Sequence, residues 1–194
     1  MITVLKNIQK KLFNKLISLY QIFKYSSKVV IQYEHKTNKT FSTEAVICPV
    51  TIENAGDASV YNGDRFIIEK YKKMLLQGDL GYYAYLDNKW VHRSWVKVGP
   101  KRIEKWYHLP PQTLKADEAY CHFGETAPSA RGYGIAPAVL SRIISDLKSK
   151  VNHIYVMVDE NNLPSRKTVE KAGFIEIKRK KVVKMFGIQY YKDL

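Results

Sequence analysis

Residues 125–140 read ETAPSARGYGIAPAVL, in which two glycines and two prolines separate a strand-like run from a sequence typical of a helix. A strand, a glycine-rich turn and a helix N-terminus together offer unpaired backbone N–H groups and the positive end of a helix dipole to an anion. Glycine at positions 132 and 134 lets the backbone approach phosphate oxygens with no Cβ in between. Neither G-x-x-x-x-G-K-S/T nor G-x-G-x-x-G is present, so the stretch predicts a phosphate-bearing ligand other than a nucleoside triphosphate or a dinucleotide.

The patterns on either side of this stretch indicate a mixed α/β sheet flanked by helices. Alternating apolar runs predict strands, and periodic apolar runs that end at a glycine predict helices. Two strand pairs are expected to be hairpins, one turning at Asp87-Asn88 and the other near Gly187. In chain order the expected elements are strands at 29–35 and 44–52, a helix from Asp64 to Gly78, a hairpin over 81–99, a strand at 118–126, a helix at 135–150, a strand at 153–159, a short helix over 162–173 and a hairpin over 175–194.

The composition predicts a folded protein in a reducing compartment. With 194 residues and 45% hydrophobic side chains, the chain can bury one sizeable core. Cys48 and Cys121 are its only cysteines and lie in apolar stretches without CxxC spacing, so neither a disulfide framework nor a metal site is expected. No secretion signal or membrane span is expected, because lysines interrupt the apolar N-terminus. These features predict a cytoplasmic location.

Residues 1–27 are expected to form a basic amphipathic helix ahead of a single domain over residues 28–194. Lysines lie between apolar residues that recur at spacings of three and four, namely Leu5, Ile8, Leu12, Leu16, Tyr20 and Phe23. This apolar stripe must be covered by something. The candidates are the chain's own domain, a second copy in a homodimer, or a membrane that residues 1–24 contact peripherally.

The net charge of +14 is concentrated at the two ends of the chain. Residues 1–40 carry +7 and residues 178–194 carry +5, which leaves +2 for residues 41–177. The lysines are either solvated faces or a means of attracting an anionic partner, such as a phosphorylated cofactor, a membrane surface or nucleic acid. Nucleic acid is the partner that we expect least.

Two motifs at matching separation resemble the GNAT superfamily of acyl-CoA-dependent N-acyltransferases. The run from Arg131 to Ala136 fits the family signature R/Q-x-x-G-x-G/A, and NLPSRKTVEKAGF resembles its later N-x-x-S/A…K-x-GF element, from Asn162 to Gly173-Phe174. The order of the elements from about residue 45 to 194 also fits. The resemblance implies an α/β (α+β) fold, with a mixed, mostly antiparallel sheet of about six to seven strands that is splayed at an acyl-CoA groove and flanked by helices.

The resemblance also implies where acetyl-CoA binds as the acyl donor. In this family the sheet splays between two central strands, and the pantetheine arm pairs with backbone groups in the gap. Residues 131–136 would then hold the pyrophosphate, and Asn162 would reach the pantetheine. Carried over by position, the cofactor-binding residues are Phe123, Gly124, Thr126, Arg131, Gly132, Tyr133, Gly134, Ile135, Ala136, Asn162 and Ser165.

Acyl transfer to an amine needs a base for the amine, a donor for the oxyanion and a proton for the departing thiolate. The base candidates are Glu118, which resembles the base position of histone-acetylating members, and His92, His122 and Glu125. Many members place a tyrosine seven residues after the capping asparagine, but this chain has Val169 there. The remaining candidates for proton donor are Tyr133, Tyr155 and Tyr190.

The function implied by the resemblance is acetyl transfer from acetyl-CoA to a primary amine of a small molecule, by direct attack in a ternary complex. Among the members of the family, the chain most resembles, though only loosely, the bacterial ones that act on amino sugars or other cell-envelope precursors. Aromatic residues around His92 and Arg93 suit a sugar ring or an anionic, phosphorylated acceptor. The alternative is a non-catalytic binding module of the same fold that docks on a membrane or nucleic acid through its basic ends.

Overall fold

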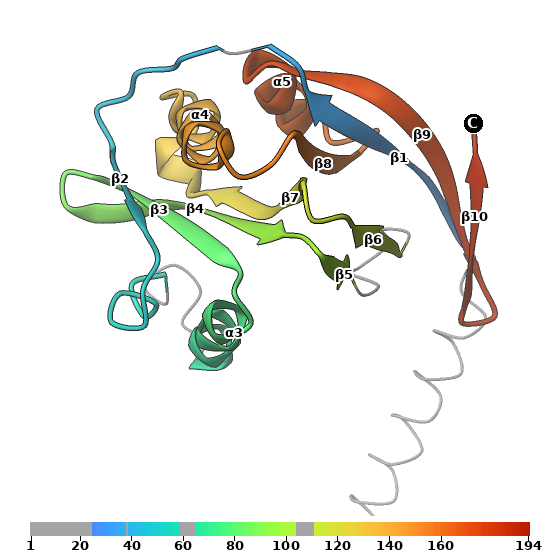
Figure 1. The fold of residues 1–194 in the computed structure, drawn as a ribbon, viewed down its shortest axis with the longest axis horizontal. Coiled ribbons are helices and arrows are strands. Elements are labelled where there is room, and N and C mark those ends of the chain that lie inside the picture. The colour runs from blue at the N-terminus through green and yellow to red at the C-terminus, as the bar shows by residue number, and fades with distance from the viewer. Residues whose placement is uncertain (1–24, 38, 59–64, 104–110) are drawn as a thin grey trace, which may run out of the picture.

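The computed structural model describes residues 25–37, 39–58, 65–103 and 111–194, and its central feature is one large sheet. Eight strands lie in the order β10-β9-β1-β8-β7-β4-β3-β2 (Figure 1). All neighbouring pairs are antiparallel except β7 and β8, which are parallel. The strands are β1 (Ser26–His35), β2 (Val46–Pro49), β3 (Leu80–Leu86), β4 (Lys89–Val98), β7 (Glu118–Thr126), β8 (His153–Asp159), β9 (Phe174–Met185) and β10 (Ile188–Asp193).

Three helices in the described part of the chain flank this sheet, so the predicted α+β class is confirmed. They are α3 (Arg65–Leu76), α4 (Ile135–Leu147) and α5 (Leu163–Lys171), and a short 3-10 turn, Pro128–Ala130, precedes α4. Figure 1 shows α4 and α5 on one face of the sheet and α3 on the other. Each face therefore has its own layer of packing.

The number of strands differs from the expectation. The resemblance implies six to seven strands, whereas all eight strand-like runs of the sequence join the sheet. A separate two-stranded ladder, β5 (Lys101–Ile103) with β6 (Gln112–Leu114), was not predicted. Strands of three residues carry too little alternation to be recognised in a sequence.

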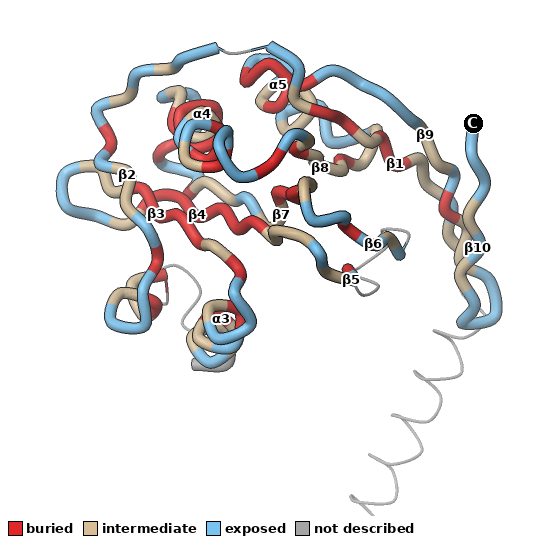
Figure 2. The backbone as a smooth tube through the Cα atoms, viewed as in Figure 1, coloured by how far each residue is buried: buried red, intermediate tan, exposed pale blue. Residues whose placement is uncertain are grey.

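The core has a large part under α4 and a smaller part under α3. On the α4 side, Val139, Ile143 and Leu147 pack against Val96 and Cys121 of the sheet. On the α3 side, the buried residues are Val50, Ala55, Ala58, Tyr71, Met74, Tyr83 and Trp95. Figure 2 shows buried residues along α4 and along β3, β4 and β7. The central strands are thus covered on both faces.

The turns of the two predicted hairpins lie where the sequence places them. Asp87 and Asn88 both have positive φ between β3 and β4, and Phe186 and Gly187 do so between β9 and β10. Gly173 closes α5 at φ 90°, where an added Cβ would lie 1.9 Å from the carbonyl oxygen of Thr37. This position therefore tolerates glycine alone.

The N-terminal segment lies almost entirely outside the described residues. Residues 1–24 of the helix predicted over residues 1–27 lie there, whereas Ser26 and Ser27 belong to β1. The described chain begins at Tyr25 and enters β1 at Ser26. Among the described helices, none combines the length and the apolar character that crossing a bilayer requires.

Candidate active site

The two parallel strands at the centre of the sheet separate halfway along their length. β7 pairs with β8 from Glu118 opposite His153 to Cys121 opposite Val156, but both strands continue further. At this point Phe123 has a φ of 58°, and the β4–β7 register skips Ser94, Phe123 and Gly124. This bulge turns β7 away from β8, as bulges near functional sites commonly do.

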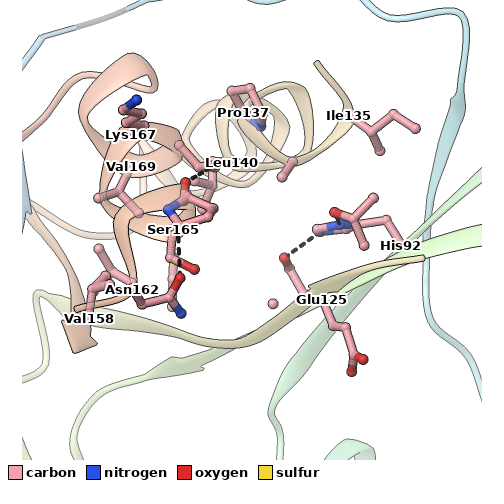
Figure 3. A pocket seen from close by; sticks show the side chains of 18 of the residues that line it. His92, Glu125, Ile135, Pro137, Leu140, Val158, Asn162, Ser165, Lys167 and Val169 are labelled. Atoms are coloured by element: carbon pink, nitrogen blue, oxygen red, sulfur yellow. Dashed lines mark hydrogen bonds between the residues drawn. The ribbon is translucent and has the colours of Figure 1, made fainter. Parts of the chain in front are cut away.

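A cavity of about 760 Å³ occupies the opening. Figure 3 shows side chains from β4, β8, α4 and α5 around it, whereas the carboxylate of Glu125 on β7 points away from those of α4 and α5. Most of the predicted site residues line it together, namely His92, His122, Phe123, Gly124, Glu125, Thr126, Arg131, Gly132, Gly134, Ile135, Ala136, Asn162 and Ser165. Glu118 and Tyr133 are not among the lining residues.

The glycine turn presents free backbone donors at one end of the cavity. Within the described chain, no group accepts a hydrogen bond from the N–H groups of residues 132–136. Gly134 is the N-cap of α4 and has a φ of 70°, which glycine adopts without strain. The sequence reading overlooked Pro137, which lines the cavity but has no N–H to offer. Ile135 and Ala136 are therefore the donors in the first turn of α4.

Three cationic side chains border the same opening. Arg131 Nε donates to the carbonyl oxygen of Thr126 at 3.2 Å, which ties its side chain to the end of β7. Lys167 and Lys171 line the cavity from α5 and are exposed. The sequence reading did not select these two lysines, although their spacing of four places them on one side of a helix.

Asn162 caps α5 at the other side of the opening. Its Oδ1 accepts a hydrogen bond from the N–H of Ser165 at 3.2 Å, while its Nδ2 has no partner among the described residues (Figure 3). Val169 is buried in the core and lines the cavity. The Thr168 hydroxyl donates to the carbonyl of Pro164, whereas Ser165, one turn before Val169, also lines the cavity.

A buried histidine links two hydroxyl groups along the cavity wall. His92 Nδ1 lies 2.7 Å from Thr126 Oγ1, and its Nε2 lies 2.8 Å from Ser94 Oγ (Figure 3). Burial lowers the pKa of His92 to about 3, and the charge of Arg93 acts in the same direction. His92 is therefore neutral at physiological pH, with both ring nitrogens engaged. A Cβ on Gly124 would lie 3.3 Å from Ser94 Oγ, so this hydroxyl borders the bulge.

His122 and Glu125 lie on either side of the bulge. Burial lowers the pKa of His122 to about 3, with the charge of Lys97 as the next cause. Its Nε2 is buried and has no hydrogen-bond partner among the described residues. Glu125 forms an ion pair with the buried Arg93, whose guanidinium lies 4.4 Å from the ring centre of Phe123. His122 and Glu125 thus flank Phe123 and Gly124 along β7.

The remaining catalytic candidates lie away from the cavity. The Glu118 carboxylate accepts the N–H of Lys115 at 2.9 Å at the start of β7. Tyr133 is exposed beside the glycine turn, and Tyr190 is exposed on β10. Burial raises the pKa of Tyr155 to about 12, and Glu118 adds to this effect. The described residues contain no cluster of three metal-ligating side chains.

Together these features define a class of protein. A mixed sheet that opens between two parallel strands, with a glycine turn and a helix N-terminus at the opening, is the arrangement that the resemblance to GNAT acyltransferases implies. The arrangement can hold a long ligand with a phosphate group at one end and place its other end at the bulge of β7.

Comparison with solved structures gives the same fold. A GNAT-family acetyltransferase of Colwellia psychrerythraea matches with a TM-score of 0.61 at 16% identity, over 87% of this chain and 57% of that one. A putative GNAT acetyltransferase of Novosphingobium aromaticivorans gives 0.58 at 12% identity, over 80% and 63%. An aminoglycoside antibiotic 6'-N-acetyltransferase of Acinetobacter baumannii gives 0.52 at 14% identity, over 68% and 91%.

The chain therefore has the GNAT fold and spans less than two thirds of the first two of these proteins. No protein-family model matches the sequence, and no curated protein matches it significantly. The likeness is one of fold, so the activity has to be argued from the residues of the opening.

Proposed function

We propose that this protein transfers an acetyl group from acetyl-CoA to a primary amine of a small molecule, by direct attack in a ternary complex. The observation that carries the proposal is the opening between β7 and β8, which has free N–H donors at one end and a bulge with polar side chains at the other. The GNAT fold of the three solved acetyltransferases supports the same activity.

The residues present fit an acyl-CoA. The free N–H groups of residues 132–136 suit pyrophosphate oxygens, and Arg131, Lys167 and Lys171 add positive charge beside them. Asn162 Nδ2 is positioned to donate to an amide carbonyl of the pantetheine arm. At the bulge, Gly124 has no partner residue in either neighbouring strand, so its backbone N–H is the oxyanion donor that we propose.

We place the general base at Glu125. It lines the cavity next to Gly124, and Arg93 holds its carboxylate in place. His122 has a lowered pKa and is therefore a weak base, and its Nε2 is buried, so we do not assign it to the amine. Glu118 is the less favoured candidate, because it caps the turn at Lys115 outside the cavity.

In this scheme the amine nitrogen attacks the thioester carbonyl, a C–N bond forms and the C–S bond breaks. Glu125 takes the proton that the amine loses and returns it to solvent, while the departing thiolate takes one proton from solvent. The Ser94 hydroxyl, held by His92, stabilises the thiolate as a hydrogen-bond donor. A thiol of pKa about 8.5 is a good leaving group, so Val169 in place of a tyrosine is compatible with turnover.

Titration of the full-length protein with acetyl-CoA tests the first step. Calorimetry should show binding in the micromolar range, and release of free thiol in the presence of a primary amine should follow. Absence of binding at millimolar acetyl-CoA would refute the proposal. Binding without thiol release from a broad panel of amines would instead favour the non-catalytic module.

A further inference from the structure

The opening between β7 and β8 reaches the face of the sheet opposite α4. Along β7, Ala119 and Cys121 pack in the core under α4, whereas Tyr120 packs with Tyr155 and Met157 of β8 on the other face. His122 stacks on Tyr120 with ring centres 5.7 Å apart. Tyr120, His122 and Met157 also line the cavity, so an amine can meet the bulge from this face.

Two lysines on this face share one buried carboxylate. Asp79, with a side chain that is 0% exposed, accepts hydrogen bonds from Lys97 Nζ at 2.5 Å and from Lys101 Nζ at 2.6 Å. Lys97 lies opposite Tyr120 in the β4–β7 register. The side chains of Lys97 and Lys101 are 21% and 25% exposed, so this lysine pair is accessible but only partly screened by water. Two cations on one carboxylate leave one positive charge in excess.

A second group of charges borders the other side of His122. Lys70 Nζ lies 4.2 Å from the ring centre of Phe123, and Arg93 lies on the same ring and pairs with Glu125. The charged groups that act on His122 are Lys97, Asp79, Lys70 and Lys101, and three of these four are cations.

Two further acidic residues of the described chain, Asp117 and Glu118, lie at the start of β7. The Glu118 carboxylate caps the turn at Lys115, and Asp117 accepts the side-chain amide of Asn152. Among the described residues, neither carboxylate forms an ion pair with Lys97 or Lys101, whose partner is Asp79.

We propose that the acceptor is an amine that also carries a carboxylate or phosphate group, which Lys97 and Lys101 bind while Glu125 meets the amine. This inference rests on the proposed acetyl transfer and names its acceptor class. A phosphorylated amino sugar or an acidic cell-envelope precursor has this chemistry. A polycation does not, so aminoglycosides, on which the Acinetobacter protein acts by name, are disfavoured here.

Matched pairs of amines test the anion subsite. Full-length protein is assayed for thiol release with O-phosphoethanolamine against ethanolamine, ω-amino acids of three to six carbons against the corresponding alkylamines, and kanamycin. We expect kcat/KM to be at least about tenfold higher for the anionic member of a pair, which corresponds to about 1.4 kcal/mol. The preference should decline as salt is raised.

Substitution of the lysine pair should remove that preference. Lys97→Gln and Lys101→Gln each leave one ammonium on Asp79, so the buried carboxylate stays paired in either variant. Each should lower kcat/KM for the amine with an anionic group about tenfold or more. The kcat/KM for the paired amine that lacks this group, and the affinity for acetyl-CoA, should stay within about twofold of the parent values. Lys178→Gln is the control, because Lys178 and Lys180 both approach Asp193, an exposed carboxylate on β10.

Binding measurements separate the subsite from the reaction. Calorimetry with O-phosphoethanolamine, in the presence of CoA, should show binding that weakens in Lys97→Gln and not in Lys178→Gln. Such binding without acetyl transfer would support the subsite and count against the proposed function. Absence of binding, unchanged preference in both lysine variants, or preferred acetylation of kanamycin would overturn the anion subsite.

Discussion

The assignment of the glycine turn to the donor's pyrophosphate can be tested with two glycines in the same conformation. Gly134 has a φ of 70° at the cavity, and Gly78 has a φ of 76° after α3, outside the cavity. A Cβ at either position would meet no protein atom within 4 Å. Valine at either position therefore carries the same left-handed backbone penalty, at least about 1–2 kcal/mol, without a steric clash.

The two variants should differ in ligand affinity. Gly134→Val places carbon where the donor approaches the N–H groups of Ile135 and Ala136, and a hydrogen bond to a charged group contributes about 1.5–3 kcal/mol. We expect acetyl-CoA affinity to fall at least about tenfold in Gly134→Val and to be unchanged in Gly78→Val. Calorimetry gives the affinities and thermal unfolding gives the shared loss of stability. Equal affinities in two folded variants with equal stability would refute the pyrophosphate assignment.

Three further outcomes are expected. Glu125→Gln should lower turnover about 10²–10⁴-fold with acetyl-CoA affinity retained, while Glu118→Gln should not; the reverse would place the base at Glu118. Because the pKa values of His92 and His122 are lowered to about 3, the unfolded chain binds more protons between about pH 6.5 and 3. As the pH is lowered through that window, the free energy of unfolding should decrease by about 1.4 kcal/mol per unit for each of these two histidines, and His92→Gln should remove its share of the slope in urea titrations. Removal of residues 1–26 should change solubility or oligomeric state more than acetyl-CoA affinity; salt-sensitive flotation with anionic vesicles, lost on truncation, would instead indicate the membrane contact.

The parts of the fold that depend on local chemistry could be predicted from the sequence. The run of glycines ahead of residue 135 predicts the start of α4, and Asp87-Asn88 predicts the turn between β3 and β4. Asn162 caps α5 as its position implies. Each of these signals comes from backbone conformations or caps that neighbouring residues determine, so no tertiary contact is needed to recognise them.

The parts that depend on contacts between distant residues could not be predicted. The left-handed Phe123 is not marked by a glycine, so the bulge that opens the sheet leaves no signal in the sequence. The pairing of Lys97 and Lys101 with Asp79 requires β3, β4 and β5 to be placed first. His92 was selected as a proton acceptor by residue type, whereas its burial and its two hydroxyl partners support the positioning role that we propose.

The distribution of charge shows how local pairing changes the meaning of a net charge. Residues 41–177 carry only +2, which by itself suggests no attraction for anions. However, the acidic residues near the opening are already paired, since Asp79 is buried between two lysines and Glu125 is held by Arg93. On the α4 face, the N–H groups of residues 132–136 add the positive end of a helix dipole without any formal charge. The opening is therefore electropositive on both faces, which suits a phosphorylated donor on one side and an anionic amine on the other.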